Sequence, residues 1–435
     1  MKREAYSLLL NWKNRPDRKP LVIQGARQVG KTWLMREFGR REYEYTAYFN
    51  FENIRELHQI FKNGYDIDRI LAALNILFGS VIDPQKTLII FDEIQSCPEA
   101  ITSLKYFNEN NPEYSIFAAG SLLGVAMHQG VSFPVGKVEF LTLQPLNFHE
   151  FLRAMGKIDL LQVLQKGDLP LIEIFHEQYI ELLRQYYFIG GMPEVLNHFA
   201  ENKDYYQARQ LQQNILTAYE NDFSKHAPVQ QLPRIRMIWQ SIVSQLTKEN
   251  SKFIYTVLRE GARAKDFELA IEWLKDAGLI HKVTRINKAG MPINAYASFS
   301  DFKIYFNDVG LLCAMANLTP EILLKENELF VEFKGAFSEQ FVLQQLVSKQ
   351  YTGYYWKPEN SQSEVDFVIQ KDNQIIPIEV KSATNVKSRS LRVYYDKYQP
   401  KLCLRTSLVG YQKQEWMENI PLYGFLHWLA PVIRG

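Results

Sequence analysis

The 435-residue sequence has few cysteines, no long apolar run and almost no net charge. Its three cysteines, Cys97, Cys313 and Cys403, lie far apart, which argues against a disulfide framework and a clustered metal site and fits a reducing cytoplasm. The apolar stretch at residues 8–10 is too short for a signal-peptide core. The most apolar tail, residues 421–433, is shorter than the ~18 residues that span a bilayer. We therefore expect a soluble, cytoplasmic protein with no membrane partner.

The charged residues nearly cancel, with 50 Lys and Arg against 48 Asp and Glu and a formal net charge of +2. No overall field therefore favours a nucleic-acid or membrane surface, and any such surface must be local. The 46% content of hydrophobic residues is that of an ordinary core-forming protein, which excludes general disorder. At roughly 150 residues per domain, the length allows about three domains.

The first third of the chain alternates short apolar runs with helical patterns. The runs at residues 87–91 and 114–119 are unbroken, which is typical of strands covered on both faces. With helices between them, these strands predict a parallel α/β sheet in a nucleotide-binding core at residues 1–145. Spaced apolar residues then predict a helical lid at residues 146–228.

The pattern changes twice more towards the C-terminus. Three helical patterns followed by two short strand patterns, at 279–283 and 296–299, predict a winged helix at residues 229–320. Its expected recognition helix, residues 265–276, is net acidic, so we expect it to pack against another domain or a protein partner and not in a DNA groove. A helix followed by strands then predicts a separate α+β domain at residues 321–435.

A G-x-x-x-x-G-K-T motif follows the first apolar strand and precedes a helix, which is the context that a P-loop requires. Its backbone N–H groups are expected to surround the phosphates of ATP at a helix N-terminus. Lys31 adds positive charge between the β- and γ-phosphates, and Thr32 ligates Mg²⁺. The predicted cofactor-binding residues of the loop are Gly25, Ala26, Arg27, Gln28, Val29, Gly30, Lys31 and Thr32.

Two carboxylates, Asp92 and Glu93, end the second apolar strand at the edge of the sheet where ligands bind. We expect Asp92 to hold Mg²⁺ and Glu93 to act as the general base on the attacking water. An acidic helix cap is the alternative. Ser121, after the strand at 114–119, either contacts the γ-phosphate or the lytic water, or caps the next helix. These residues predict hydrolysis as well as binding.

The expected lid contains a Gly-Gly-Met-Pro-Glu turn at residues 190–194. Pro193 is a candidate contact for the adenine, although the turn could simply separate two helices. A cation other than Lys31 is also expected to stabilise the γ-phosphate in the transition state. Lys137, Arg27 and Arg184 are candidates, Lys137 in a neighbouring subunit of an oligomer, and the sequence does not choose among them.

A second group of charged residues lies in the C-terminal region. Asp366 and Glu379 could hold a second Mg²⁺ or Mn²⁺, with Glu339 as a further carboxylate, while Lys381 acts on a water. This is chemistry for phosphodiester hydrolysis, but alternating charges on a strand are more often its solvated face. The basic segment at residues 381–405 carries Tyr394, Tyr395 and Tyr398, which would suit a nucleic-acid groove or an ordinary surface helix.

Together these motifs resemble a family of predicted prokaryotic ATPases of the AAA type, whose C-terminal domain of unknown function is related to PD-(D/E)XK nucleases. The resemblance covers nearly the whole chain and rests on the P-loop, Asp92-Glu93, residues 119–123, 145–151 and 190–194, and Glu379-Val380-Lys381. It implies an AAA-type core and lid, a winged helix and a nuclease-like end, with Pro193 at the nucleotide. The first nuclease motif departs from Pro-Asp, since the sequence reads Glu364-Val365-Asp366.

These observations lead to one expectation and two rivals, the weaker of which is an ATP-dependent DNA-remodelling motor. We expect an ATP-hydrolysing switch that controls a nuclease-like C-terminal domain acting on nucleic acid. In the stronger rival interpretation, nucleotide controls an interaction switch whose C-terminal modules bind protein or DNA without cleaving it.

Overall fold

The computed structural model describes residues 2–120, 134–247, 252–324, 331–359, 361–382 and 388–429. It divides into two compact units, and each is described by itself. The first comprises residues 2–144 with 276–279, and the second comprises residues 145–275 and 280–435. Within the described part of the chain, no helix is long and apolar enough to cross a membrane.

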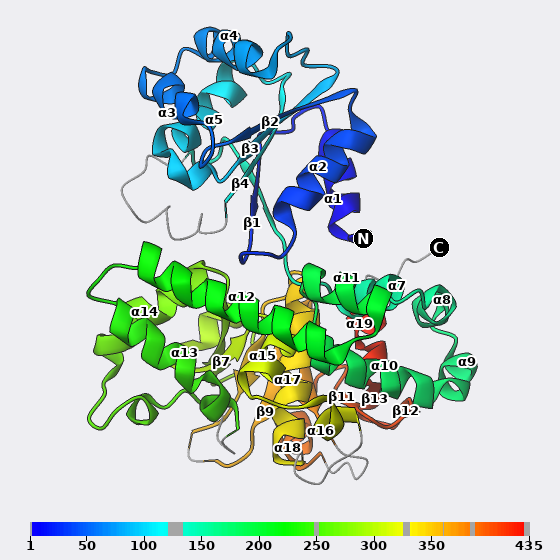
Figure 1. Cartoon of the computed structure of the whole chain (residues 1–435). Helices are drawn as coiled ribbons and strands as arrows, with labels where there is room; N and C mark the ends of the chain where they lie inside the picture. Colours follow the sequence, from blue (N-terminus) through cyan, green and yellow to red (C-terminus); the bar gives the residue numbers. More distant parts are fainter. Residues whose placement is uncertain are drawn as a thin grey trace. The chain divides into compact units, whose positions relative to one another are not determined.

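The first unit is built on a parallel sheet, whose described strands have the order β2-β3-β4-β1-β5. Its central strands β3 and β4 are buried at every residue, as the unbroken apolar runs predict. Figure 1 shows α1 and α2 on one side of the sheet and α3, α4 and α5 on the other. The elements are α1 Ala5–Lys13, β1 Leu21–Gln24, α2 Lys31–Glu42, β2 Tyr45–Asn50, α3 Arg55–Lys62, α4 Ile67–Phe78, β3 Thr87–Asp92, η1 Ile94–Ser96, α5 Pro98–Asn110, β4 Ser115–Ala119 and β5 Glu139–Thr142.

The second unit starts with a run of helices where the sequence predicts a lid. The turn at residues 190–194 separates α10 from α11 and is packed inside this unit. A Cβ on Gly191 would collide with the carbonyl oxygen of Leu146, and the Gly191 N–H donates to Asp308 at 2.6 Å. The helices are α7 Phe148–Ala154, α8 Ile158–Lys166, α9 Leu169–Ile174, α10 His176–Ile189, α11 Pro193–Asn202, α12 Tyr205–His226, α13 Leu232–Leu246 and α14 Ala264–Asp276.

The rest of the second unit contains a sheet with the order β12-β13-β11-β10-β9-β8-β6-β7 among the described residues. Its elements are β6 Ile280–Ile286, β7 Ala297–Phe306, α15 Val309–Met315, α16 Pro320–Leu324, α17 Val331–Ser348, β8 Tyr354–Trp356, β9 Val365–Lys371, β10 Gln374–Val380, α18 Arg389–Tyr398, β11 Leu404–Ser407, β12 Gln412–Lys413, β13 Glu418–Pro421 and α19 Phe425–Leu429, with three 3₁₀ turns at η2 Tyr255–Val257, η3 Ile293–Tyr296 and η5 Leu422–Gly424.

This sheet joins two regions that the sequence analysis assigns to separate domains. Strands β6 and β7, expected as the ribs of a wing, pair with each other, and β6 also pairs in parallel with β8. The pairing buries Ile286 beside Trp356 in one hydrophobic core. The expected boundary at residue 320 therefore falls between strands of a single sheet. Short strands with apolar faces show no sign in their sequence of which partner they will pair with.

Candidate functional site: a P-loop and a carboxylate–lysine cluster

The loop between β1 and α2 has the backbone geometry of a phosphate-binding turn. Gly25 has φ +142°, and a Cβ there would collide with the carbonyl oxygen of Leu143. Gly30 has φ +93° and precedes the first residue of α2. Both positions require glycine. The loop therefore turns tightly and brings backbone N–H groups to the N-terminus of a 12-residue helix, where anions are favoured.

Lys31 is the first residue of α2, and its side chain is almost fully buried. Its ammonium group donates to the carbonyl oxygens of Gly25 and Ala26, each at 2.8 Å. Burial lowers the pKa of Lys31 to about 8, although the charges of Glu93 and Asp92 act in the opposite direction. The loop thus holds a desolvated cation at the helix N-terminus.

The side chains of Thr32 and Asp92, both predicted to hold Mg²⁺, are in contact. The Thr32 hydroxyl donates to Oδ2 of Asp92 at 2.8 Å, and Asp92, the last residue of β3, is 3% exposed. Tyr48, on the neighbouring strand β2, donates to the same oxygen at 2.7 Å. The guanidinium of Arg36 lies 3.8 Å from the centre of the Tyr48 ring. A hydroxyl and a carboxylate oxygen are ligands that suit Mg²⁺.

Sequence reasoning missed Tyr48. The structure shows why Tyr48 belongs to the site. Strands β2 and β3 are adjacent in the sheet, and Tyr48 pairs with Ile90, two residues before Asp92. Ends of parallel strands bring such side chains to the same edge.

Glu93 follows Asp92 with φ 53°, a conformation that is uncommon outside glycine. It precedes the short turn η1, but its side chain makes no capping hydrogen bond. Instead, the amide of Gln95 donates to its carboxylate at 2.6 Å. The helix-cap alternative for Glu93 therefore has no support in this geometry, and a strained residue beside a metal-type carboxylate is typical of functional sites.

Several other predicted residues do not join this group. Ser121 lies outside the described residues. Lys137 forms an ion pair with Glu109 at 2.9 Å on the surface of the first unit. Pro193, the first residue of α11, and Arg184, on α10, belong to the second unit, so their predicted contacts with nucleotide stay predictions.

The second unit brings together Glu339, Asp366, Glu379 and Lys381 with three residues that were not predicted as site residues. These three residues are Lys303, Tyr305 and Glu364. We call all seven residues the carboxylate–lysine cluster. Phe367 on β9 pairs with Ile378 on the antiparallel strand β10. Asp366 precedes Phe367 and Glu379 follows Ile378, so the two carboxylates are neighbours across the two strands. Nζ of Lys381 lies 2.7 Å from Oε1 of Glu379.

Asp366 is the most perturbed carboxyl group of this cluster. Burial, together with the charge of Glu339, raises the pKa of Asp366. Its Oδ2 accepts a hydrogen bond from the backbone N–H of Val380 at 2.7 Å. Glu379, only 3% exposed, accepts from the backbone N–H of Leu391 at 3.0 Å. Both carboxylates are therefore held by the backbone of this unit.

The tyrosines of the basic segment pack inward instead of lining a groove. Tyr394 is fully buried, with its ring centroid 5.1 Å from that of Trp356, and Tyr398 also lies against Trp356. Tyr395 packs on Trp416 at 5.6 Å. Tyr394 and Tyr398 are four residues apart on α18 and so share one face. Residues 389–398 of this segment form an amphipathic helix, the alternative that the sequence left open.

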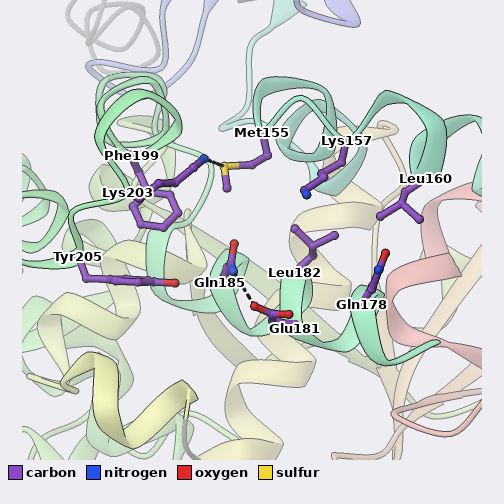
Figure 2. A pocket seen from close by; sticks show the side chains of 10 residues that line it. All are labelled: Met155, Lys157, Leu160, Gln178, Glu181, Leu182, Gln185, Phe199, Lys203 and Tyr205. Carbon is purple, nitrogen blue, oxygen red and sulfur yellow. Dashed lines mark hydrogen bonds between the residues drawn. The ribbon is translucent and has the colours of Figure 1, made fainter. Parts of the chain in front are cut away.

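A hollow of about 440 Å³ lies among the helices of the second unit. Figure 2 shows Lys203 reaching towards Met155, with Nζ 3.7 Å from Sδ, and Gln185 bonded to Glu181. Lys157 lines the same hollow. No predicted site residue is among those that line it.

Comparisons with known proteins agree with the geometry of the first unit. Residues 17–152 match the family model described as "AAA domain", residues 180–322 match "Domain of unknown function (DUF8612)", and residues 334–425 match "Domain of unknown function (DUF4143)". A search of curated proteins finds no match.

Three solved structures are similar at low identity. The Walker-type ATPase PABY2304 of Pyrococcus abyssi is 14% identical over 72% of this chain and 95% of its own, with a TM-score of 0.43. The Orc1 protein of Aeropyrum pernix in complex with DNA is 13% identical over 72% and 91%, with a TM-score of 0.26. AMPPCP-bound DnaA of Aquifex aeolicus is 15% identical over 63% and 88%, with a TM-score of 0.26.

The first unit is therefore an AAA-type P-loop domain, which confirms the predicted fold of the core. Such a domain binds nucleotide, typically with Mg²⁺. The winged helix and the relation to PD-(D/E)XK nucleases stay predictions.

Proposed function

We propose that the first unit hydrolyses ATP. The observation that carries this proposal is the contact of Thr32 with Asp92 beside the buried Lys31. The backbone of the loop at residues 25–32 would surround the phosphates, and Lys31 would balance their charge. Thr32 and Asp92 would hold Mg²⁺, which neutralises developing charge on the phosphates when it is bound.

Glu93 is the proposed general base. Its carboxylate follows Asp92 directly, and the amide of Gln95 fixes one of its oxygens at 2.6 Å. From this position Glu93 would orient a water and take its proton, which typically contributes about 10²- to 10⁴-fold in rate. Tyr48 would hold Asp92 in place by donating to Oδ2.

Glu93→Gln tests the role of the base. The change keeps the size and polarity of the side chain, so the variant should bind ATP as tightly as the wild type in equilibrium titrations. Its rate of phosphate release should fall by about 10² or more. Full turnover, or loss of binding, would contradict the assignment. Glu99→Gln, on the first turn of α5, is a matched control that should leave both unchanged.

For the second unit we propose an interaction module whose state depends on the nucleotide in the first unit, and which binds a protein or nucleic-acid partner without cutting it. The ion pairs of Lys303 with Glu364 and of Lys381 with Glu379 support the absence of cleavage, because they occupy carboxylates that a catalytic metal ion would need. Among the residues that the structure describes, no three His, Cys, Asp or Glu side chains are placed to hold a metal ion. A metal ion there would depend on the phosphate oxygens of a substrate for its further ligands.

A metal-dependent nuclease is the second candidate, favoured by the approach of Lys381 to Glu379 beside Asp366. Purified protein incubated with Mn²⁺, with and without ATP, on duplex and single-stranded DNA and RNA separates the two. The interaction module predicts intact substrates in every reaction. Cleavage that disappears in Asp366→Ala would establish the nuclease instead.

A further inference from the structure

Lys303 lies inside the carboxylate–lysine cluster, although it comes from a strand that the sequence analysis assigns to a wing. It belongs to β7, and its side chain is 1% exposed. Nζ lies 2.6 Å from Oε1 of Glu364 and 3.7 Å from Oε2 of Glu339. Tyr305, two residues on and so on the same face, donates to Oε2 of Glu339 at 2.6 Å.

Four other carboxylate oxygens of the cluster also have partners within the unit. Oε2 of Glu364 lies 3.1 Å from Nζ of Lys357. Asp366 accepts from the backbone of Val380, and Glu379 accepts from the backbone of Leu391 and pairs with Lys381. A divalent cation at these oxygens would be repelled by the ammonium groups of Lys303, Lys357 and Lys381, which already lie against them. The residues present therefore do not fit a resident metal.

Lys303 remains a cation in this environment. Burial alone would lower the pKa of Lys303, but the charges of Glu339, Glu364 and Asp366 outweigh burial and raise it. A buried charge is tolerated only when it is paired, and the same holds for the carboxylates around it. The ammonium group of Lys303 thus supplies these carboxylates with the positive charge that a bound metal ion supplies in metal sites.

We propose that Lys303 is a built-in cation that takes the place of a metal ion, so that the cluster is complete without one. The inference rests on the proposed interaction function of the second unit and gives its physical reason. The cluster also has a stabilising role in this proposal. Lys303 on β7 contacts Glu339 on α17 and Glu364 in the segment before β9, and so links these three parts of the unit.

Lys303→Met tests this directly, since methionine removes the charge and keeps a long unbranched side chain. The variant should melt at least about 5 °C below the wild type, because Glu364 and Glu339 lose their counter-charge. Millimolar Mn²⁺ should raise the melting temperature of the variant and bind to it in calorimetry. Wild-type protein without nucleotide should show neither response. Lys275→Met, which breaks the exposed pair with Glu272, is the matched control and should behave as wild type.

A double variant keeps the test possible if Lys303→Met folds poorly. Lys303→Met combined with Glu364→Gln removes both charges of the closest pair, so it should recover part of the lost stability and no longer respond to Mn²⁺. If neither the wild type nor Lys303→Met responds to Mn²⁺, the built-in-cation role is overturned while the interaction function stands. Mn²⁺ binding by the wild type that is lost in Asp366→Ala would overturn both.

Discussion

The P-loop site and the carboxylate–lysine cluster use the same residue types in opposite ways. In the P-loop site, Lys31 rests on backbone carbonyl groups and Asp92 accepts from two neutral hydroxyl groups. In the cluster, Lys303 and Lys381 each lie against carboxylates. In our proposal, the first arrangement leaves charge to be balanced by a phosphate and a metal, whereas in the second each lysine is paired with a carboxylate of the same unit. The comparison teaches that residue types do not distinguish a site for ligands from a structural network; their partners do.

Removing the lysine from each site should have opposite effects. Lys31→Ala should weaken ATP binding by about 100-fold or more, because the phosphates lose a cation in a poorly solvated position. Its stability at pH 7 should not fall, since burial disfavours the charged form of Lys31 and no carboxylate lies within hydrogen-bonding distance among its described contacts. Lys303→Met should lose stability and keep ATP affinity. Equilibrium nucleotide titrations and thermal melts of both variants measure this; a variant that loses both properties equally would break the comparison.

Removing a carboxylate from each site gives the next largest effect. Glu364→Gln should cost about 2–3 kcal/mol of unfolding free energy, below the ~3–5 kcal/mol of a fully buried pair because Glu339 still faces Lys303. Asp92→Asn should cost about 1 kcal/mol, since Thr32 and Tyr48 can still donate to the amide oxygen, whereas the amide NH₂ cannot accept from the backbone N–H of Glu93.

The two carboxylate variants are compared by urea unfolding and by phosphate release. Asp92→Asn should lose Mg²⁺-dependent turnover, whereas Glu364→Gln should keep it. A large loss of stability in Asp92→Asn would place Asp92 in a structural network like that of Glu364.

The pH dependence of ATP binding gives the smallest effect. The pKa of Lys31, lowered by burial to about 8, is below its ordinary value of 10.5. ATP binds the charged form, so affinity should fall as the pH rises through 8, by about tenfold between pH 7 and pH 9. Lys31→Ala should show no such dependence. In contrast, the raised pKa of Lys303 keeps the Lys303 ammonium group charged over this range. Affinity that is flat across pH 7–9 in the wild type would contradict the lowered pKa.

The lowered pKa of Lys31 also determines how the stability of the fold changes with pH. Because the pKa of Lys31 is lower in the folded than in the unfolded chain, the unfolded chain binds more protons between about pH 8 and 10.5. The contribution of Lys31 to stability therefore rises with pH in that window and is lowest below pH 8.

The P-loop site could be predicted from sequence because its residues are local. The loop, Lys31 and Thr32 are consecutive, and Asp92 follows a strand that is buried at every residue. The cluster could be predicted only in part: Glu339, Asp366, Glu379 and Lys381 were grouped from sequence. Lys303 was not, because it belongs to a strand whose pairing the sequence does not specify. The one signal was a lysine inside the apolar run 302–306. A charged residue at a position otherwise expected to be buried indicates a buried partner.

The measurement that tests this contrast most directly is the number of Mn²⁺ ions bound per chain, with and without a non-hydrolysable ATP analogue. In our proposal, Thr32 and Asp92 provide a metal position that needs nucleotide, and Lys303 takes the place of a metal ion in the cluster. We therefore predict a single tightly bound Mn²⁺ with the analogue, lost in Asp92→Asn, and none without it. A second Mn²⁺ that binds without nucleotide and is lost in Asp366→Ala would contradict the account.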